Sequence, residues 1–529
     1  MKRKLRINFL LSYKGLIMPM LNWVGKNSDK DPINVQENRK NIQLVEINHN
    51  PNIDKYDFVQ KFNYQKDNSL FDLKSSQNWY NLLFIGDNLQ ILTYLVREYL
   101  KKINLIYIDP PFATGSNFKY KIVVGEEGAS EILESYSDNW SNDIDEYISF
   151  MYDRLNLMKL LLSDNGSIYV HLDWHISHYI KVILDEIFGK ENFRNEIIWA
   201  YPAASVKTRR FFIRSFDSIL FYTKSENYTF NDDPSIYMEY SNRVKDNLKQ
   251  DEKGKFYYRG GSHGGKKLSQ KVYLQEEGIF PRDVWNDIPY IRANTSEYQG
   301  FSTQKPERLL KRIILASSNP GDLIADFFCG TGTTLCVAEK LNRKWIGADN
   351  RTNAINITRK RLFDIYSSNN LYSWKSKFKK MAKPFKIIRF GDNREDFTIP
   401  VNLINQEITN DLSIQNSKLQ FTVSINTKKH YADIELTNYS IPKSELLHTD
   451  LLNKIVDFSD WIDSWAVDYN FKENEFNTTW VSFRTFKKKK LSLRSKPYPY
   501  EKKGEYKVAV KVINIFGGES VQSYKVIIN

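Results

Sequence analysis

Cysteine is scarce in this sequence, and long apolar runs are missing. Only Cys329 and Cys336 occur among the 529 residues, seven positions apart. Two thiols cannot build a framework of several disulfides, and they cannot supply the four ligands of a cysteine-type zinc site. No apolar stretch is long enough to cross a bilayer as a helix, which argues against a membrane protein. These features favour a protein of the reducing cytoplasm.

Two common nucleotide-binding motifs are also absent. No Gly-Lys-Ser or Gly-Lys-Thr sequence is present, which excludes a P-loop. The glycine-rich segment at Gly330 and Gly332 has Leu335 where a dinucleotide-binding fingerprint requires its third glycine. No helicase or nuclease motif occurs either.

The composition fits a large globular protein with a polyanionic partner. A chain of 529 residues is expected to form two or three domains. Its hydrophobic content of 41%, with 14% aromatic residues, can fill a sizeable core. The 76 Lys and Arg residues outnumber the 63 Asp and Glu residues, which gives a net charge of +13. Such an excess of positive charge indicates contact with a polyanion.

From Asn81 to Tyr366 short apolar runs alternate with amphipathic stretches. This alternation is typical of a parallel sheet covered by helices, and it predicts the α/β class. The expected strands are Leu82–Ile85, Leu105–Ile108, Ser167–Leu172, Glu196–Ala200, Ser218–Tyr222, Leu323–Asp326 and Lys344–Ala348. The expected helices are Leu89–Leu100, Ile144–Leu162, His175–Phe188, Pro306–Ser317, Thr333–Leu341 and Ala354–Tyr366. Between them, Ala113–Asn142 is expected to be a polar loop.

The pattern changes in three other regions. The stretch Glu226–Ile291 is rich in Asp, Asn, Lys, Gly and Tyr and has no clear period, so we interpret it as an inserted module. After about Ser368 the helical patterns stop, and a basic linker leads to alternating strands. The final pair, Glu505–Asn514 and Ser520–Ile528, predicts a hairpin within a small antiparallel β domain, expected to be a sandwich. Residues up to about Met18 are expected to be disordered or to precede the true start.

The short peptide Asp109-Pro110-Pro111-Phe112 follows the apolar run Ile103–Ile108. Two prolines can continue neither a helix nor a central strand, so the chain must turn sharply where the strand ends. The turn holds a carboxylate, two ring-locked backbones and an aromatic face in one rigid patch. Such a patch suits a flat ring that bears an exocyclic amine. Taken alone, however, the peptide is better explained as a rigid structural turn.

A second signature, Asp326-Phe327-Phe328-Cys329-Gly330-Thr331-Gly332-Thr333-Thr334, follows the expected strand Leu323–Asp326. Gly330 and Gly332 remove Cβ atoms from a turn between strand and helix, so backbone N–H groups can approach a bound nucleoside. Asp349 closes the next strand, where its carboxylate is placed to accept hydrogen bonds from both ribose hydroxyls. The alternative is a turn without a ligand, which the strand–turn–helix context disfavours.

Together and in this order, the two signatures resemble the permuted (beta-class) S-adenosylmethionine-dependent DNA amino-methyltransferases. They are most similar to the modification (Mod) subunits of type III restriction–modification systems, and the resemblance covers about Met18–Ile365. It implies a doubly wound, mixed Rossmann-like methyltransferase sheet with an inserted target-recognition module and a C-terminal antiparallel β domain. The implied division is an N-terminal extension at 1–40, a catalytic half at 41–225, the target-recognition insertion at 226–291, a cofactor-binding half at 292–370, a basic linker at 371–400 and the C-terminal β domain at 401–529.

The resemblance also implies S-adenosylmethionine as the cofactor and assigns its pocket. The residues implied to bind the cofactor are Asp87, Thr303, Gln304, Lys305, Pro306, Asp326, Phe328, Gly330, Gly332 and Asp349. Within this set, Asp87 is matched to the group that meets the adenine amine of the cofactor. The Thr303–Pro306 segment is matched to the element that helps to enclose the methionine carboxylate. Asp87 is also explained by an ordinary Gly-Asp-Asn turn.

The implied reaction transfers a methyl group to the exocyclic amine of a DNA base, which must first swing out of the duplex. Asp109 and the Pro110 carbonyl are assigned to accept the amine hydrogens, Pro111 keeps the turn rigid, and Phe112 stacks on the ring. In the family, Asp in the first position occurs mostly with adenine N6, so Asp109 favours site-specific adenine-N6 methylation. The alternatives are cytosine-N4 methylation, RNA methylation and a non-catalytic DNA-targeting subunit of a nuclease complex.

Interleaved basic and aromatic residues predict where DNA is contacted. The candidates are Lys207, Arg209, Arg210, Arg214, Lys266 and Lys267. A solvated surface loop is a competing explanation for any one of them. The implied partners are double-stranded DNA, a separate restriction subunit with helicase and nuclease activity, and a second copy of the chain in a homodimer. No membrane is expected, and the implied compartment is the prokaryotic cytoplasm.

Four residues that can bind metals stand close together, namely His171, Asp173, His175 and His178. However, His171 and Asp173 end an expected strand, whereas the other two begin a helix. Methyl transfer from a sulfonium also needs no metal. We therefore expect no metal here, and we expect His171 and Asp173 to line the cavity.

Overall fold

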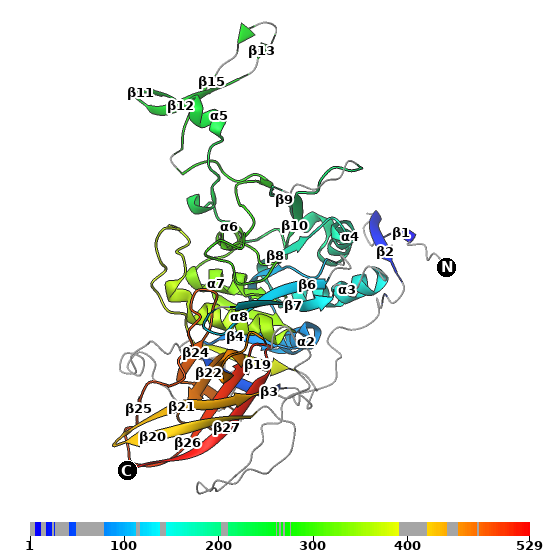
Figure 1. Cartoon of the computed structure of the whole chain (residues 1–529). Helices are drawn as coiled ribbons and strands as arrows, with labels where there is room; N and C mark the ends of the chain where they lie inside the picture. Colours follow the sequence, from blue (N-terminus) through cyan, green and yellow to red (C-terminus); the bar gives the residue numbers. More distant parts are fainter. Residues whose placement is uncertain are drawn as a thin grey trace.

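The computed structural model describes sixteen stretches of the chain. These are residues 6–11, 17–23, 26, 42–48, 79–112, 117–127, 129–137, 144–202, 210–260, 262–263, 266–267, 270–275, 277–390, 420–441, 453–472 and 475–529. Within them, an eleven-stranded sheet forms the centre of the molecule, with helices on both faces (Figure 1). No helix in these stretches is long and apolar enough to span a bilayer.

The central sheet is mixed and has the strand order β16-β9-β10-β8-β5-β17-β18-β4-β19-β3-β23. Six neighbouring strands, from β8 to β19, run parallel to one another. In chain order the strands of the sheet are β3 (Ile42–Asn48), β4 (Asn81–Ile85), β5 (Ile103–Ile108), β8 (Leu162–Leu172), β9 (Phe193–Ala200), β10 (Phe216–Thr223), β16 (Val284–Trp285), β17 (Leu323–Asp326), β18 (Lys344–Asp349), β19 (Phe385–Phe390) and β23 (Glu475–Thr478).

The sheet places β17 directly beside β5, although the two strands are far apart in the sequence. Ile324 pairs with Leu105 and Ala325 pairs with Ile106, in parallel. The segments that follow the two strands therefore emerge at the same edge. In open α/β sheets this carboxyl edge is where ligands bind.

Helices cover both faces of the sheet because successive strand residues point to opposite sides. Leu82 and Phe84 of β4 belong to one hydrophobic core, and Leu83 and Ile85 belong to the other. The first core includes α2 (Asn88–Tyr99), α3 (Ile144–Leu161) and α4 (Ser177–Phe188). The second includes α6 (Glu307–Ser317), α7 (Thr333–Lys340) and α8 (Thr352–Phe363).

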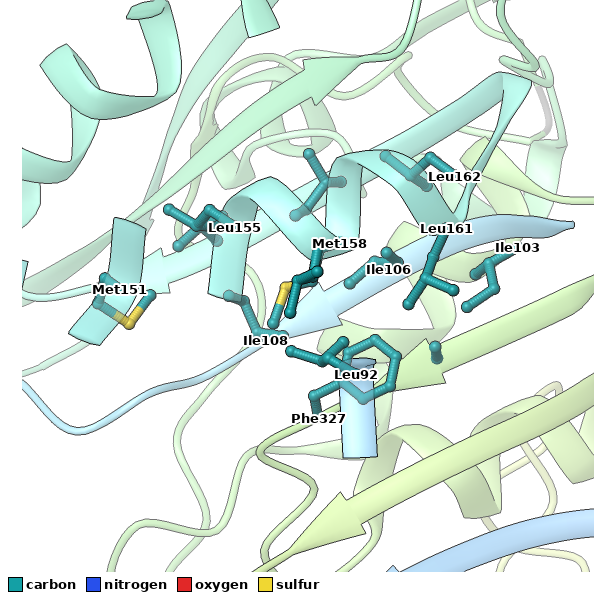
Figure 2. Close-up of a cluster of buried hydrophobic side chains, with 14 of the residues drawn as sticks. Leu92, Ile103, Ile106, Ile108, Met151, Leu155, Met158, Leu161, Leu162 and Phe327 are labelled. Carbon is teal, nitrogen blue, oxygen red and sulfur yellow. The ribbon is translucent and has the colours of Figure 1, made fainter. Parts of the chain in front are cut away.

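Figure 2 shows how closely one of these helices packs on the sheet. Met151, Leu155 and Met158 of α3 lie over Ile106 and Ile108 of β5. All five side chains are fully buried. Burying an apolar side chain of this size stabilises the fold by about 1.5–3 kcal/mol. The packing therefore fixes β5, whose last residue immediately precedes Asp109.

The doubly wound α/β class is confirmed, and the predicted strands and helices between Leu82 and Phe363 are present with shifted ends. The prediction of a polar loop at Ala113–Asn142 was wrong. This region contains a hairpin of β6 (Asn117–Val124) and β7 (Ala129–Ser137). Tyr120, Ile122 and Val124 of β6 are buried in a cluster with Phe301 and Ile515. This spacing of two residues is typical of a strand with one buried face.

The N-terminal residues also form more structure than expected. An antiparallel ribbon joins β1 (Arg6–Leu11) to β2 (Ile17–Asn22), so the prediction of disorder up to about Met18 was wrong for these strands. Beyond the ribbon, the Trp23 indole N–H donates to Ser149 Oγ at 2.6 Å. This hydrogen bond ties the segment to α3.

The region interpreted as an inserted module forms a small sheet that stands away from the central body (Figure 1). Its strands are β11 (Lys249–Asp251), β12 (Gly254–Arg259) and β15 (Gln270–Tyr273), accompanied by α5 (Asn242–Asp246) and the short pair β13 (Ser262–His263) and β14 (Lys266–Lys267). Near its two ends, Ile236 and Trp285 are buried in the second core of the central body. The inserted module is thus anchored to the central body by a buried side chain near each of its ends.

The C-terminal region forms two antiparallel sheets around a shared core, as expected for a sandwich. One sheet contains β20 (Gln420–Lys428), β21 (Tyr431–Ser440) and β25 (Tyr498–Pro499). The other contains β24 (Trp480–Phe483), β22 (Ile462–Asp468), β26 (Gly504–Asn514) and β27 (Glu519–Ile528). The region is not confined to its own sheets, because β23 pairs with β3 and so extends the central sheet.

A buried group of charges joins the C-terminal sandwich to the central body. Glu46 of β3 accepts hydrogen bonds from Arg359 of α8 at 3.1 Å and from Lys511 of β26 at 2.6 Å. Lys511 also lies 3.0 Å from Glu519. Burial acts to raise the pKa of Glu46, but the charges of Lys511 and Arg359 outweigh it and lower the pKa to about 2. Glu46 is therefore ionised and balanced by cations from both sides of the junction.

Glu46→Gln should destabilise the protein by about 3 kcal/mol at neutral pH, because it leaves buried cations with less compensation. Glu505→Gln, which removes an exposed partner of Lys525, is the matched control and should have a much smaller effect. The folded pKa of Glu46 is lowered, so its contribution is present at neutral pH and is lost as the pH falls towards 2. Urea unfolding at several pH values measures both effects. Equal losses in the two variants would contradict a stabilising role for the buried group.

Candidate active site

Five carboxylates follow parallel strands of the sheet, so they emerge at one edge. Asp87, Asp109 and Asp173 follow β4, β5 and β8, whereas Asp326 and Asp349 are the last residues of β17 and β18. A cavity of about 680 Å³, including the space at its open mouth, lies at this edge.

The cavity brings together the three segments singled out in the sequence. The predicted residues that line it are Asp109, Pro110, Phe112, Thr303, Gln304, Lys305, Asp326, Phe328 and Gly330. Tyr107, Phe301, Leu310, Cys329, Thr331, Thr333, Thr334 and Arg351 complete the lining. The Asp-Pro-Pro-Phe peptide and the glycine-rich turn therefore face one space.

Asp109 is held by an ion pair that the sequence did not predict. Lys305 Nζ donates to Asp109 Oδ2 at 2.5 Å. Oδ1 of the same carboxylate is buried and has no hydrogen-bond partner among the described residues. An unsatisfied buried acceptor is costly, and it calls for an explanation such as a ligand group. The carboxylate is thus fixed through one oxygen, while the other can accept a hydrogen bond.

The turn after β5 is also fixed from behind. The Tyr147 hydroxyl of α3 donates to the Pro111 carbonyl at 2.7 Å. Pro111 itself does not line the cavity, whereas Pro110 does. Pro110 therefore faces the cavity, whereas Pro111 anchors the turn to α3.

A buried hydrogen-bonded chain supports the Phe112 ring. His171 stacks on Phe112 with ring centres 6.1 Å apart and planes inclined by 27°. The Tyr107 hydroxyl and His171 Nδ1 form a hydrogen bond of 2.8 Å, and His171 Nε2 forms one of 3.1 Å with Asp217 Oδ2. Asp217 Oδ1 accepts a further bond from the Tyr201 hydroxyl at 2.8 Å. Every polar atom of the imidazole is used, so the ring is held firmly behind Phe112.

This network of hydrogen bonds also affects the charge of Asp217. Burial acts to raise the pKa of Asp217, but the hydrogen bond from His171 and the charge of Lys305 hold it below its ordinary value. Burial and the neighbouring Asp217 raise the pKa of Tyr201. Within this network Asp217 is therefore ionised, and the neutral Tyr201 hydroxyl donates a hydrogen bond to it.

The expectation that His171 and Asp173 line the cavity was wrong. His171 lies behind Phe112, and Asp173 Oδ2 forms a 2.5 Å hydrogen bond with His175 Nδ1. Neither residue belongs to the lining. In the part of the chain that the structure describes, no group of three or more His, Cys, Asp or Glu side chains is arranged to hold a metal ion.

The two glycines of the second signature have different roles in the turn. Gly330 has φ +51°, and a Cβ atom added there would meet nothing within 4 Å. Gly332 has φ +72°, and a Cβ atom would lie 2.5 Å from the Thr358 side chain. Gly332 is therefore required by packing, whereas the absence of a side chain at Gly330 leaves open space beside the cavity.

Asp326 is a buried carboxyl beneath this turn. Its Oδ1 accepts the Phe328 N–H at 3.0 Å, and its Oδ2 accepts the Thr334 hydroxyl at 2.5 Å. Burial raises the pKa of Asp326 to about 7, against the lowering effect of these two hydrogen bonds. Asp109 and Asp349 raise it further by like-charge repulsion. Asp326 therefore changes its charge near neutral pH.

Asp349 is already engaged by the protein. Gly330 N–H donates to its Oδ2 at 2.9 Å, and the Arg351 guanidinium donates to Oδ1 at 2.9 Å and to Oδ2 at 3.0 Å. Arg351 lines the cavity, whereas Asp349 does not. Ribose hydroxyls would share this carboxylate with Arg351. The sequence analysis did not identify Arg351, because an arginine after a strand carries no specific signal.

Three other predicted cofactor residues also lie outside the lining. Pro306 is next to Lys305 and precedes α6, and Gly332 lies one residue beyond Thr331. Asp87 caps α2 by accepting the Leu89 N–H at 2.8 Å, and it pairs with Arg154 at 2.8 Å. The structure therefore does not bring Asp87 to the cavity, and a contact with the cofactor stays a prediction.

The predicted DNA-contacting residues are described only in part. Arg210 and Arg214 are exposed on the segment that enters β10. Lys207 and Arg209 lie outside the described residues. The backbone of Lys266 and Lys267 forms β14, and their side chains are not described. A role in DNA binding stays a prediction for all six residues.

The arrangement can hold a flat amine-bearing ring beside an electrophile. The cavity lining includes an aromatic face and a carboxylate oxygen that has no partner among the described residues, and it also includes a glycine turn with open space beside it. The sequence analysis missed Tyr107, Tyr201 and Asp217. The one signal for Tyr107 was its position on β5, two residues before Asp109, since alternate residues of an extended chain share a face.

The profile of the DNA methylase family matches residues 103–360. Type II methyltransferase M.EcaI of Enterobacter cloacae is 32% identical over 350 residues, which cover 58% of this chain and 75% of that protein. DNA adenine methyltransferase YhdJ of Escherichia coli is 30% identical over 278 residues, covering 52% of this chain and 81% of that protein.

A type III protein is also similar. The probable HindVI Mod subunit of Haemophilus influenzae is 26% identical over 378 residues, and the match covers 51% of this chain and 48% of that subunit. The chain thus matches about half of this Mod subunit but three quarters or more of the two shorter relatives. By its identity with these relatives over most of their length, the chain belongs to the N6/N4 DNA methylase family.

Proposed function

We propose that this protein transfers a methyl group from S-adenosylmethionine to the N6 amine of adenine in double-stranded DNA, at a specific sequence. The observation that supports this most directly is the buried, unpartnered Oδ1 of Asp109 beside Phe112, in a cavity shared with the glycine-rich turn. A purely structural Asp-Pro-Pro-Phe turn would have no need to leave a carboxylate oxygen unsatisfied.

The residues of the glycine-rich turn and of the neighbouring strand end fit S-adenosylmethionine. Gly330 leaves space for a nucleoside against the backbone, and Asp349 closes the neighbouring strand as an acceptor for ribose hydroxyls. In this proposal Asp326 pairs with the ammonium of the methionine part and Phe328 contacts the nucleoside, and both residues line the cavity.

The bound cofactor supplies a methyl group on a sulfonium, which is already electrophilic. The chain has to orient the amine. Asp109 Oδ1 and the Pro110 carbonyl accept its two hydrogens and so draw the nitrogen lone pair out of conjugation. Phe112 holds the ring by stacking, which contributes about 1–3 kcal/mol. Much of the rate then comes from alignment of the reacting atoms.

Lys305 acts as a positioning residue in this scheme. Its ion pair with Asp109 Oδ2 sets the direction of the carboxylate, and the bond from Tyr147 to the Pro111 carbonyl sets the backbone of the turn. His171 supports Phe112 from behind. The catalytic patch is therefore rigid before the base arrives, as efficient catalysis requires.

Adenine is the proposed acceptor because the first residue of the motif is Asp109 and because a relative is named a DNA adenine methyltransferase. The similarity to a type II methyltransferase and a type III Mod subunit supports a role as the modification component of a restriction–modification system. In that role the protein acts in the prokaryotic cytoplasm, as a homodimer, and with cleavage performed by a separate restriction subunit.

Asp109→Ala should reduce methyl transfer by at least about 10²–10³-fold, because it removes an acceptor that orients the amine. Cofactor affinity, measured by isothermal titration calorimetry, should change little. Asp164→Ala, which removes an exposed partner of Lys101, is the control and should leave both unchanged. Labelled methyl transfer to plasmid DNA, followed by nucleoside analysis and mapping of modified sites, measures the reaction. Retained turnover in Asp109→Ala would remove the assignment, and N4-methylcytosine as the product would replace adenine as the acceptor.

The affinity for S-adenosylmethionine should rise with pH and level off above about pH 7. The pKa of Asp326 in the free protein is about 7, so below this pH the carboxyl is neutral and cannot pair with the ammonium of the ligand. Calorimetric titration between pH 5.5 and 8.5 measures the dependence, and S-adenosylhomocysteine, which bears the same ammonium, serves as a second ligand.

Two variants separate this effect from a general effect of pH. Asp326→Asn should abolish the pH dependence. Thr334→Val removes a hydrogen bond that lowers the pKa of Asp326, so it should shift the midpoint to higher pH. An unchanged pH profile in both variants would show that another group is responsible.

A further inference from the structure

The segment that enters β10 exposes an unusual run of apolar side chains. Phe212 is 98% exposed and Phe211 is 58% exposed, and Ile213 and Phe216 are exposed as well. Adjacent exposed apolar residues of this size are unfavourable in water and mark a surface that binds something. In the described part of the chain, nothing covers the Phe212 ring.

The topology places this run at the catalytic edge of the sheet. Ser218 of β10 pairs with Leu172 of β8, and β8 lies beside β5, whose end carries Asp109. Two strand spacings, about 10 Å, therefore separate the start of β10 from the end of β5. The two are also connected chemically, since Asp217 at the base of this segment holds His171, which stacks on Phe112.

Positive charge flanks the apolar run. The Arg214 guanidinium lies 3.6 Å from the centre of the Trp174 ring and 5.2 Å from that of Phe211. Arg210 is exposed on the other side of the run. Trp174 follows directly after Asp173 at the end of β8. An apolar tip between two arginines is complementary to stacked bases between two phosphate backbones.

We propose that Phe212 inserts into the DNA duplex and fills the space that the target base leaves when it enters the cavity. The proposal rests on the proposed function. Extrusion of a base breaks its pairing and stacking, and an apolar side chain placed between base steps replaces part of the lost contact. Arg210 and Arg214 bind the phosphates on either side, so that the tip enters the duplex in a fixed direction.

Phe212 is a better candidate for the inserted residue than Phe211. Phe211 has a cation–π contact with Arg214. Phe212 has no aromatic or cationic contact within the described stretches and is almost fully exposed. Its ring is therefore available without the loss of an existing interaction. As a residue that stabilises the extruded state, Phe212 is a positioning residue rather than a catalytic one.

The test uses the full-length protein and a duplex oligonucleotide that contains the site mapped from methylated plasmid DNA. A second duplex carries a mismatched base opposite the target, and a third has 2-aminopurine at the target position. The variants are Phe212→Ala and Phe212→Trp, and Tyr431→Ala is the matched control. Tyr431 is an exposed aromatic residue as well, but it lies on β21 in the C-terminal sandwich.

Phe212→Ala should lower kcat/KM on the paired duplex about tenfold or more and should reduce the rise in 2-aminopurine fluorescence on binding. On the mismatched duplex, where extrusion is easier, its kcat/KM should return to within about twofold of the unmodified protein. Phe212→Trp should retain both signals. Tyr431→Ala should behave as the unmodified protein, and cofactor binding should be unchanged in every variant.

Two results would overturn the proposal while leaving the proposed function intact. One is unchanged methylation of the paired duplex by Phe212→Ala. The other is an equal loss on paired and mismatched duplexes, which would indicate an ordinary DNA contact. A change in self-association without a change in methylation would assign the apolar run to a protein partner instead. Absence of methylation by the unmodified protein would overturn the proposed function itself, and this inference with it.

Discussion

The parallel pairing of β5 with β17 is the constraint on which the site depends. Ile324 pairs with Leu105 and Ala325 with Ile106, so two distant segments leave the sheet side by side. The strand order β5-β17-β18-β4 places the later pair of strands between the earlier pair. Because all four strands are parallel, every turn that carries a candidate residue emerges at one edge. A shift of β17 by a single residue would turn Asp326 towards the opposite face, since strand side chains alternate.

Two carboxylates at this edge of the sheet differ in how well the protein satisfies their oxygens. Asp349, which lies outside the cavity lining, accepts hydrogen bonds from Arg351 and Gly330 through both oxygens. Asp109, which lines the cavity, is held through one oxygen, and the second has no partner among the described residues. An unsatisfied acceptor costs about 1–3 kcal/mol. The fold bears this cost at the position where an amine would be bound, while Lys305 and Tyr147 keep the turn rigid.

Local patterns in the sequence predicted the elements and both ends of the site, but not the contacts between distant segments. Strand and helix periods indicated the sheet, and the sharp turn after Ile108 indicated the candidate catalytic residues. The ion pair of Lys305 with Asp109 and the hydrogen-bond network of Asp217 depend on which strands become neighbours in the sheet. The spacing of apolar residues along the sequence carries no information about that order. The hairpin of β6 and β7 was missed because its polar residues suggested a loop, although Tyr120, Ile122 and Val124 of β6 are buried with Phe301 and Ile515.

Helix α8 explains why the C-terminal sandwich belongs to the same structural unit as the cavity. Of four consecutive residues of this helix, two form hydrogen bonds with the glycine-rich turn and two form hydrogen bonds with the sandwich. Thr358 donates to the Gly330 carbonyl at 3.0 Å, and Arg361 donates to the Thr331 carbonyl at 2.8 Å, so both hold the glycine-rich turn. Arg359 donates to Ser464 at 3.1 Å and Lys360 to Asp463 at 2.6 Å, so both hold β22 of the sandwich. The turn is therefore supported through one helix by a region that contributes nothing to the lining of the cavity. Loss of the sandwich would leave the cations of α8 without these partners, and the effect would reach the turn through the same four residues.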